Sequence, residues 1–229
     1  MALQEIPALA FTPAKRIQES FAAEAEKRAL LWLAARTPAW INSDHLTALG
    51  FAGTVGAGIC YALAGWEPRM LLAAVACLAV NWLGDSLDGT LARARNRQRP
   101  RYGFYVDHVI DTFSAFFVMG GLALSGYVHP AIAMGMLVAF LMLSAEAYLA
   151  SYTLKRFRLS YAKFGPTELR ILLAAGSVAL LFRPVIHIIG RPWLLFDVGG
   201  VIAMAGMGGM LVTSAICHTV QLYREERVQ

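Results

Sequence analysis

The chain has 229 residues, of which 58% are hydrophobic and only 15% are charged, and its mean hydropathy is +0.54. Soluble domains carry about 25% charged residues, so this composition excludes an ordinary soluble protein and favours one that spans a bilayer. The net charge of +5 comes from basic residues between apolar segments. That distribution is typical of contact with anionic lipid headgroups, and we do not expect nucleic acid as a partner.

The first part of the chain, residues 1–40, is expected to form a cytoplasmic juxtamembrane segment. Charged residues alternate there with apolar ones such as Phe21, Leu30 and Trp32, and this charge excludes the apolar core of a cleavable signal peptide. The pattern predicts an amphipathic helix that lies at the membrane surface and ends near Thr37. The alternative is a solvated helix packed on the protein's own cytoplasmic face.

Six later segments are long and apolar enough to cross the hydrocarbon, which takes about 20 residues. Turn-forming sequences with glycine or proline separate them. The expected spans run from Asp44 to Ala64, Arg69 to Ala92, Tyr105 to Tyr127, Pro130 to Leu154, Pro166 to Ile189 and Leu194 to Leu222. We therefore predict an all-α integral membrane protein with one six-helix domain, residues 41–223, and a cytoplasmic tail, residues 224–229.

The basic residues are distributed unevenly between the two sides of these spans. One side receives the N-terminal segment, the basic loops after the second and fourth spans, and the C-terminal tail. The other side receives only Arg69, Arg183 and Arg191. The positive-inside rule places both termini in the cytoplasm, together with the charged ends of the second and third spans. We expect a multi-pass protein of a bacterial or archaeal cytoplasmic membrane.

Four aspartates lie where the second span ends and the third begins. Asp85 and Asp88 are three residues apart and Asp107 and Asp111 are four apart, so each pair shares one helix face. The two spans are joined by a short loop and run antiparallel, which brings the pairs together. Four carboxylates at membrane depth are unfavourable unless cations neutralise them. The pattern predicts a site for Mg²⁺ or Mn²⁺, with two ions expected; salt bridges to the loop arginines are the alternative.

Two glycines and an arginine accompany the aspartates. Gly89 and Gly103 leave out a side chain where a ligand or a neighbouring helix approaches closely. Arg93, one turn after Gly89, is placed to bind a phosphate. We therefore expect a nucleotide diphosphate beside the metal.

This segment resembles the signature of the CDP-alcohol phosphotransferase family, D-x-x-D-G-x-x-A-R followed by G-x-x-x-D-x-x-x-D. Every signature position is present: Asp85, Asp88, Gly89, Ala92, Arg93, Gly103, Asp107 and Asp111. The family's architecture of six spans after an amphipathic helix matches the expected elements. Asn42 and Thr47 resemble the family's Pro-Asn-x-x-Thr motif loosely, because Ile41 stands where a proline is common.

The resemblance implies transfer of a phosphatidyl-type group from a CDP-alcohol, commonly CDP-diacylglycerol, to a hydroxyl acceptor in phospholipid biosynthesis, with release of CMP. It implies Asp85, Asp88 and Asp107 as metal ligands. Asp111 would complete the metal site or act as the base that removes the acceptor's hydroxyl proton. The CDP-alcohol would contact Gly89, Ala92, Arg93, Gly103, Asn42 and Thr47. A homodimer is also implied, and the glycines and methionines from Gly199 to Met210 are typical of a close-packed helix interface.

The acceptor is expected to bind where the fifth span begins, the region that has this role in the family. The candidates are Lys155, Lys163, Glu168 and Arg170. Basic side chains suit a phosphorylated acceptor, whereas a carboxylate suits a polyol or an amine. The alternative is that Glu168 and Arg170 bind each other or cap the helix.

Other functions remain open at this point. A related enzyme could transfer a headgroup phosphate from CDP-choline or CDP-ethanolamine to diacylglycerol. A divalent-cation channel or transporter also holds aspartates within the membrane, although it has no need of Arg93 and the two glycines. Soluble prenyl-diphosphate synthases use aspartate-rich motifs too, but their motifs lie far apart in sequence.

Overall fold

The computed structural model describes residues 15–17, 23–154, 156–158 and 166–226, and helices dominate it. The helices are α1 (Ala23–Arg36), α2 (Ser43–Ala64), α3 (Met70–Ala94), α4 (Pro100–Leu124), α5 (Pro130–Leu154), α6 (Pro166–Phe182) and α7 (Leu195–Glu225). Two short sheets accompany them. Strand β1 (Lys15–Ile17) pairs in parallel with β2 (Arg156–Arg158), and β3 (Val185–Ile188) pairs antiparallel with β4 (Arg191–Leu194).

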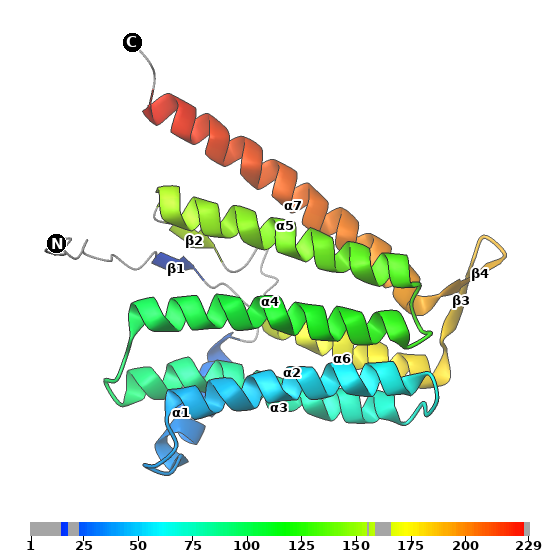
Figure 1. The fold of residues 1–229 in the computed structure, drawn as a ribbon, viewed down its shortest axis with the longest axis horizontal. Helices are drawn as coiled ribbons and strands as arrows, with labels where there is room; N and C mark the ends of the chain where they lie inside the picture. Colours follow the sequence, from blue (N-terminus) through cyan, green and yellow to red (C-terminus); the bar gives the residue numbers. More distant parts are fainter. Residues whose placement is uncertain (1–14, 18–22, 155, 159–165, 227–229) are drawn as a thin grey trace, which may run out of the picture.

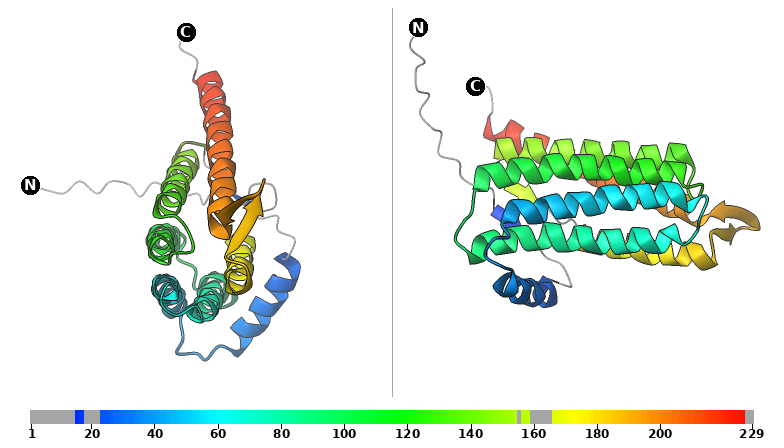
Figure 2. Two further views of the ribbon diagram at one scale, coloured as in Figure 1. Left: turned by 90° about the vertical axis from the view of Figure 1, so that its right-hand side faces the viewer. Right: turned by 60° about the horizontal axis from the view of Figure 1, so that its bottom comes forward.

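The long helices run up and down beside one another, and α1 is inclined to them at one end (Figures 1 and 2). Helix α2 packs against both α3 and α4, α5 packs against α4 and α7, and α6 packs against α3. The C-terminal half of α7 diverges from the other helices (Figure 1). The end of α3 and the start of α4 lie at the same end of the bundle as α1, so the aspartates of both helices gather there.

Five of these helices, α2, α3, α4, α5 and α7, are long and apolar enough to cross a membrane. This agrees with a multi-pass membrane protein. Helix α6 has 17 residues, so the count of six spans stays a prediction, as does the position of α1 at the membrane surface. The bounds of α5 agree with the expected span from Pro130 to Leu154.

The expected span from Pro166 to Ile189 is wrong at its end, because α6 stops at Phe182. Pro184 disfavours a helical conformation at the residue before it, and the apolar residues that follow form the β3–β4 hairpin instead. The turn of this hairpin has positive φ angles at Ile189 and Gly190, 51° and 74°. Helix α4 also begins earlier than expected, at Pro100, because proline is favoured in the first helical turn.

Small residues let α2 lie close to its two neighbours. A Cβ atom added at Gly53 would lie 2.7 Å from the backbone nitrogen of Asn81 in α3. Gly58 of α2 and Gly121 of α4 face each other, and a Cβ on either would overlap backbone atoms of the other helix. Close approach of this kind is the usual packing mode of membrane helices. It fixes α3 and α4 on either side of α2.

The glycines expected to form a close-packed interface in the last span differ from one another. Gly200 packs against α5, where an added Cβ would lie 2.6 Å from Ile132 Cγ2. No atom lies within 4 Å of a Cβ added at Gly199, Gly206, Gly208 or Gly209. The close backbone-to-backbone packing is therefore made by α2, Gly200 packs against side chains of α5, and a dimer through α7 stays a prediction.

Candidate metal and substrate site

Three of the four aspartates converge at one point. Asp85 comes from the last turns of α3, and Asp107 and Asp111 come from consecutive turns near the start of α4. Each offers a carboxylate oxygen, and these three oxygens lie within 4.8 Å of one another. A set of hard oxygen donors at this spacing fits a divalent cation such as Mg²⁺ or Mn²⁺.

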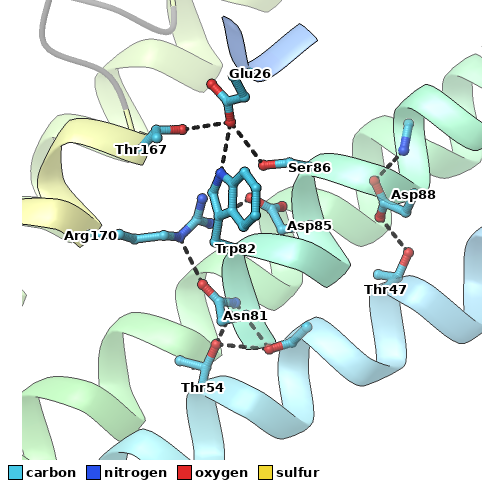
Figure 3. A network of polar contacts seen from close by, with 12 residues as sticks. Glu26, Thr47, Thr54, Asn81, Trp82, Asp85, Ser86, Asp88, Thr167 and Arg170 are labelled. Atoms are coloured by element: carbon cyan, nitrogen blue, oxygen red, sulfur yellow. Dashed lines mark hydrogen bonds and ion pairs between the residues drawn. The ribbon is translucent and has the colours of Figure 1, made fainter. Parts of the chain in front are cut away.

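Asp88, one turn after Asp85, is held by other groups. The hydroxyl of Thr47 donates to Asp88 Oδ2 at 2.6 Å, and the backbone N–H of Gly89 donates to Oδ1 (Figure 3). Thr47 belongs to α2, so this bond ties the start of α2 to the aspartates of α3. Asp88 is not among the three converging carboxylates, and its role as a metal ligand stays a prediction.

Arg170 brings α6 to the same site. Its Nη2 donates to Asp85 Oδ2 at 2.5 Å, and its Nε donates to Asn81 Oδ1 at 2.8 Å (Figure 3). The Asn81 amide in turn donates to the Thr54 hydroxyl at 2.7 Å and to the Gly50 carbonyl at 3.0 Å. A residue expected in the acceptor region thus lies directly against one of the candidate metal ligands.

Two arginines of the loop between α3 and α4 bond elsewhere. Arg99 pairs with Asp44 at the start of α2. Arg95 donates to the backbone carbonyls of Thr37 and Ile41, at 2.7 and 2.5 Å. Both contacts hold the connection between α1 and α2, so these arginines do not neutralise the aspartate pairs.

In the described part of the chain, no neighbouring helix lies against the two signature glycines. The nearest atom to a Cβ added at Gly89 would be Nη1 of Arg93, at 3.3 Å, and nothing lies within 4 Å of one added at Gly103. Arg93 donates to the Thr90 hydroxyl at 3.2 Å. Helix packing within the described residues therefore explains neither glycine, and contact of Gly89 and Gly103 with the CDP-alcohol stays a prediction.

Asn42 has a structural contact of its own. It caps α2: its side chain accepts from the backbone N–H of His45 at 3.0 Å, and its own N–H donates to His45 Nδ1 at 3.3 Å. Contact with the nucleotide stays a prediction for this residue.

A cavity of about 220 Å³ lies beside this site, between α2 and α4. Thr47, the partner of Asp88, is at its wall, and most of the other lining residues are apolar: Ala48, Phe51, Val106 and Ile110, with Asp44 and Tyr102 completing it. An apolar wall next to the aspartates suits a lipid-linked substrate.

Glu26 of α1 is a residue whose role the sequence analysis missed. Its Oε1 accepts from Trp82 Nε1 at 2.8 Å, from Thr167 Oγ1 at 3.0 Å and from Ser86 Oγ at 3.3 Å (Figure 3). It therefore joins α1, α3 and α6 beside the turn that carries Asp85. The available signal was the spacing of Trp82 and Ser86, four residues apart on one face of α3.

The remaining candidates are placed as follows. Glu168 lies in the first turn of α6 and is half-buried, and Ala92 is half-buried near the end of α3. Lys155 and Lys163, both predicted to contact the acceptor, lie outside the described residues.

Comparison with known proteins adds one finding. The sequence profile described as CDP-alcohol phosphatidyltransferase matches residues 40–215, more than three quarters of the 229 residues. No curated protein matches the chain. The matched range includes all four aspartates, Arg93 and Arg170, and it begins after α1.

Proposed function

The chain belongs to the CDP-alcohol phosphatidyltransferase family, and we propose that it transfers a phosphatidyl-type group from CDP-diacylglycerol to a small polar alcohol and releases CMP. The observation that carries this proposal is the convergence of Asp85, Asp107 and Asp111 inside the matched range. The three carboxylates would hold Mg²⁺ or Mn²⁺, with Asp88 completing a site for two ions. A bound divalent cation stabilises the negative charge that develops on a diphosphate during phosphoryl transfer.

The CDP end of the donor would lie over the signature glycines. Gly89 and Gly103 leave open space, and the Arg93 guanidinium beside Gly89 is placed to bind the diphosphate. The acyl chains would occupy the apolar side, where the cavity between α2 and α4 opens next to Thr47. Asn42, Thr47 and Ala92 are the other proposed contacts of the donor.

In the transfer step, the acceptor's hydroxyl oxygen attacks the phosphorus that bears the lipid. The bond from that phosphorus to the bridging oxygen breaks, and CMP leaves with the electron pair. Asp111 would take the proton of the acceptor hydroxyl. One of its carboxylate oxygens lies within 4.8 Å of oxygens of Asp85 and Asp107, so Asp111 is placed to take this proton from an acceptor held next to the metal.

Two other functions remain alternatives. In the first, a headgroup phosphate is transferred from CDP-choline or CDP-ethanolamine to diacylglycerol. The same aspartates would act, but the headgroup would carry the CDP and the lipid would be the acceptor. A divalent-cation channel would use the aspartates as a binding site along a path, without turnover.

An acceptor screen tests the proposal. Purified protein is supplied with CDP-diacylglycerol, Mg²⁺ or Mn²⁺, and one of glycerol 3-phosphate, inositol phosphate, inositol, glycerol, serine or ethanolamine. CMP and the lipid product are then measured. A parallel reaction offers CDP-ethanolamine with diacylglycerol.

We expect CMP and a new phospholipid in equal amounts with one acceptor of the first set. CMP formation only in the parallel reaction would support the alternative in which CDP-ethanolamine is the donor and diacylglycerol is the acceptor. Cation flux into protein-containing vesicles, without CMP from any CDP-alcohol, would contradict the proposal and support a channel.

A further inference from the structure

Arg170 of α6 carries a positive charge inside the helical bundle, and the transfer step does not use it. Its side chain is only 17% exposed. A charged side chain in the membrane-embedded part of a protein is unfavourable unless it is paired, so its partners indicate its function. Both partners belong to α3: Asn81 Oδ1 accepts from Nε at 2.8 Å, and Asp85 Oδ2 accepts from Nη2 at 2.5 Å.

The two partners match one edge of the guanidinium group. Asn81 and Asp85 are four residues apart and share a face of α3. The Nε and Nη2 atoms lie along the same edge of the planar group, so one N–H points to each partner (Figure 3). Because the guanidinium is a rigid fork, fixing one N–H fixes the direction of the other. Asn81 therefore sets the direction from which Arg170 meets Asp85.

Asn81 is itself held in place by α2. Its oxygen must face Arg170, which has only donors, and its NH₂ group donates to the Thr54 hydroxyl at 2.7 Å and to the Gly50 carbonyl at 3.0 Å. Thr54 is 3% exposed, and a Cβ added at Gly53 would lie only 2.7 Å from the Asn81 backbone nitrogen. A continuous set of hydrogen bonds thus runs from α2 through Asn81 to α6.

This set of hydrogen bonds ends on a candidate metal ligand. Asp107 and Asp111 share α4, whereas Asp85 comes from α3, so the direction of the Asp85 carboxylate decides whether all three can bind one ion. An ionised carboxylate has about four lone-pair sites, so it can accept from Arg170 and still bind a metal. Hydrogen bonds from an outer residue orient a ligating carboxylate, and their loss usually weakens metal binding by about 10-fold to 100-fold.

We propose that Arg170 is a positioning residue: anchored by Asn81, it holds the Asp85 carboxylate toward the divalent cation and does not bind the acceptor alcohol. The inference rests on the metal site of the proposed function. An anionic acceptor would compete with Asp85 for the same guanidinium, and it would give Asn81 no role. The two assignments therefore differ in which constant changes when the anchor is removed.

The test compares Asn81→Leu with the wild type. Leucine has a similar size, removes both polar groups of the amide and leaves every charge in place. Binding of Mn²⁺ to the purified full-length protein is measured from the electron paramagnetic resonance signal of free Mn²⁺, without any substrate. We expect the Kd for Mn²⁺ to rise about 10-fold to 100-fold. The KM for the acceptor at saturating Mn²⁺ should change less than about twofold, because no contact with the acceptor is lost.

Arg170→Lys provides a second variant, which also serves if Asn81→Leu does not fold. Lysine keeps the positive charge, but its ammonium group cannot reproduce the two parallel bonds of the fork. We expect a similar rise in the Kd for Mn²⁺, and orientation explains it since the charge is unchanged. Because both residues act through one bond, the double variant should resemble either single variant and should not show the product of the two effects.

Tyr61→Phe is the matched control. Tyr61 of α2 and Ser177 of α6 share a buried hydrogen bond of 2.8 Å, which joins the same two helices. Ser177 is seven residues after Arg170, about two turns along α6. Loss of this bond should lower the melting temperature and leave the Kd for Mn²⁺ unchanged, as expected for a contact that serves stability alone.

Three results would overturn the inference. The first is an unchanged Kd for Mn²⁺ in both Asn81→Leu and Arg170→Lys. The second is a double variant whose Kd shows the product of the two single effects. The third is a higher acceptor KM in Arg170→Lys with an unchanged Kd for Mn²⁺, which would assign Arg170 to the acceptor. Binding of Mn²⁺ that depends on Asn81, without CMP release from any CDP-alcohol, would instead contradict the proposed transfer and still support the positioning role.

Discussion

At the scale of single residues, the contact between Thr47 and Asp88 shows how a hydroxyl on one helix orients a carboxylate on the next. The bond is 2.6 Å long and partly buried. The backbone N–H of Gly89 bonds the other oxygen. These two bonds hold the Asp88 carboxylate in one orientation. Loss of the Thr47 hydroxyl should therefore disturb the position of Asp88, although Thr47 itself cannot bind a metal as a carboxylate does.

We expect Thr47→Val to lower kcat/KM for CDP-diacylglycerol by about tenfold, the effect of one hydrogen bond to a charged group. Valine keeps the shape of threonine and removes only the hydroxyl. Thr213→Val is the control, because Thr213 is exposed on α7 and its hydroxyl donates to the backbone carbonyl of Gly209 at 2.8 Å. An equal effect of both variants on kcat/KM would show that the bond to Asp88 has no special role.

At the same scale, the sequence predicted the local geometry and missed the distant partners. Spacings of three and four residues identified which aspartates share a helix face, because helical periodicity is a local property. The bond from Arg170 to Asp85 joins residues 85 positions apart, and the one from Trp82 to Glu26 joins residues 56 apart. Such pairs depend on how whole helices pack, which no local pattern encodes.

At the scale of elements, α1 is tied to the site although it precedes the matched family range. Leu30 and Ala34 of α1 pack with Leu46, Leu87 and Leu91 of α2 and α3 in one buried cluster. Glu26 adds hydrogen bonds to α3 and α6. Helix α1 therefore supports the turn of α3 that carries Asp85 as well as the start of α6.

We expect Glu26→Ala to lower the free energy of unfolding by about 2 kcal/mol, since it removes the shared acceptor of three hydrogen bonds worth about 1 kcal/mol each or less. Thermal unfolding in detergent, with CMP release measured in parallel, checks this. Glu26→Gln keeps one acceptor oxygen, so its free energy of unfolding and its rate of CMP release should lie between those of Glu26→Ala and the wild type. Lys27→Ala, at the exposed neighbouring position on α1, is the control; an equally large loss there would contradict a specific role of Glu26.

The end of α6 shows where hydropathy alone fails to predict the limit of a helix. The mostly apolar segment from Val185 to Ile188 resembles the continuation of a span, yet it forms a strand. Arg183 and Pro184 carry the signal that α6 ends, because proline restricts the residue before it. Hydropathy averaged over a span's length is insensitive to such a two-residue break.

At the scale of the whole molecule, glycines on α2 and α4 set the distance between the helices that carry the site. Gly58 and Gly121 meet backbone to backbone. They lie near the fully buried Tyr61 and Leu122. The spacing of α2, α3 and α4 decides whether aspartates from α3 and α4 can share one ion.

Two adjacent glycines allow a matched test of this packing. A Cβ at Gly121 would overlap Gly58, whereas nothing lies within 4 Å of a Cβ added at Gly120. We expect Gly121→Ala to lower the free energy of unfolding by about 1–3 kcal/mol, the usual effect of overpacking. Gly120→Ala should be neutral or slightly stabilising, because alanine favours helix more than glycine does. Equal melting temperatures for the two variants would contradict the close packing of α2 against α4.

The most direct test of the central claim is the dependence of CMP release on divalent metal, compared between the wild type and Asp111→Asn. With CDP-diacylglycerol and the acceptor found by the screen, EDTA should abolish CMP release by the wild type and added Mn²⁺ or Mg²⁺ should restore it. Asp111→Asn should still bind CDP-diacylglycerol but release CMP about 10²-fold to 10⁴-fold more slowly, the usual contribution of a general base. CMP release that persists in EDTA, or normal turnover by Asp111→Asn, would contradict a metal-dependent transfer with Asp111 as its base.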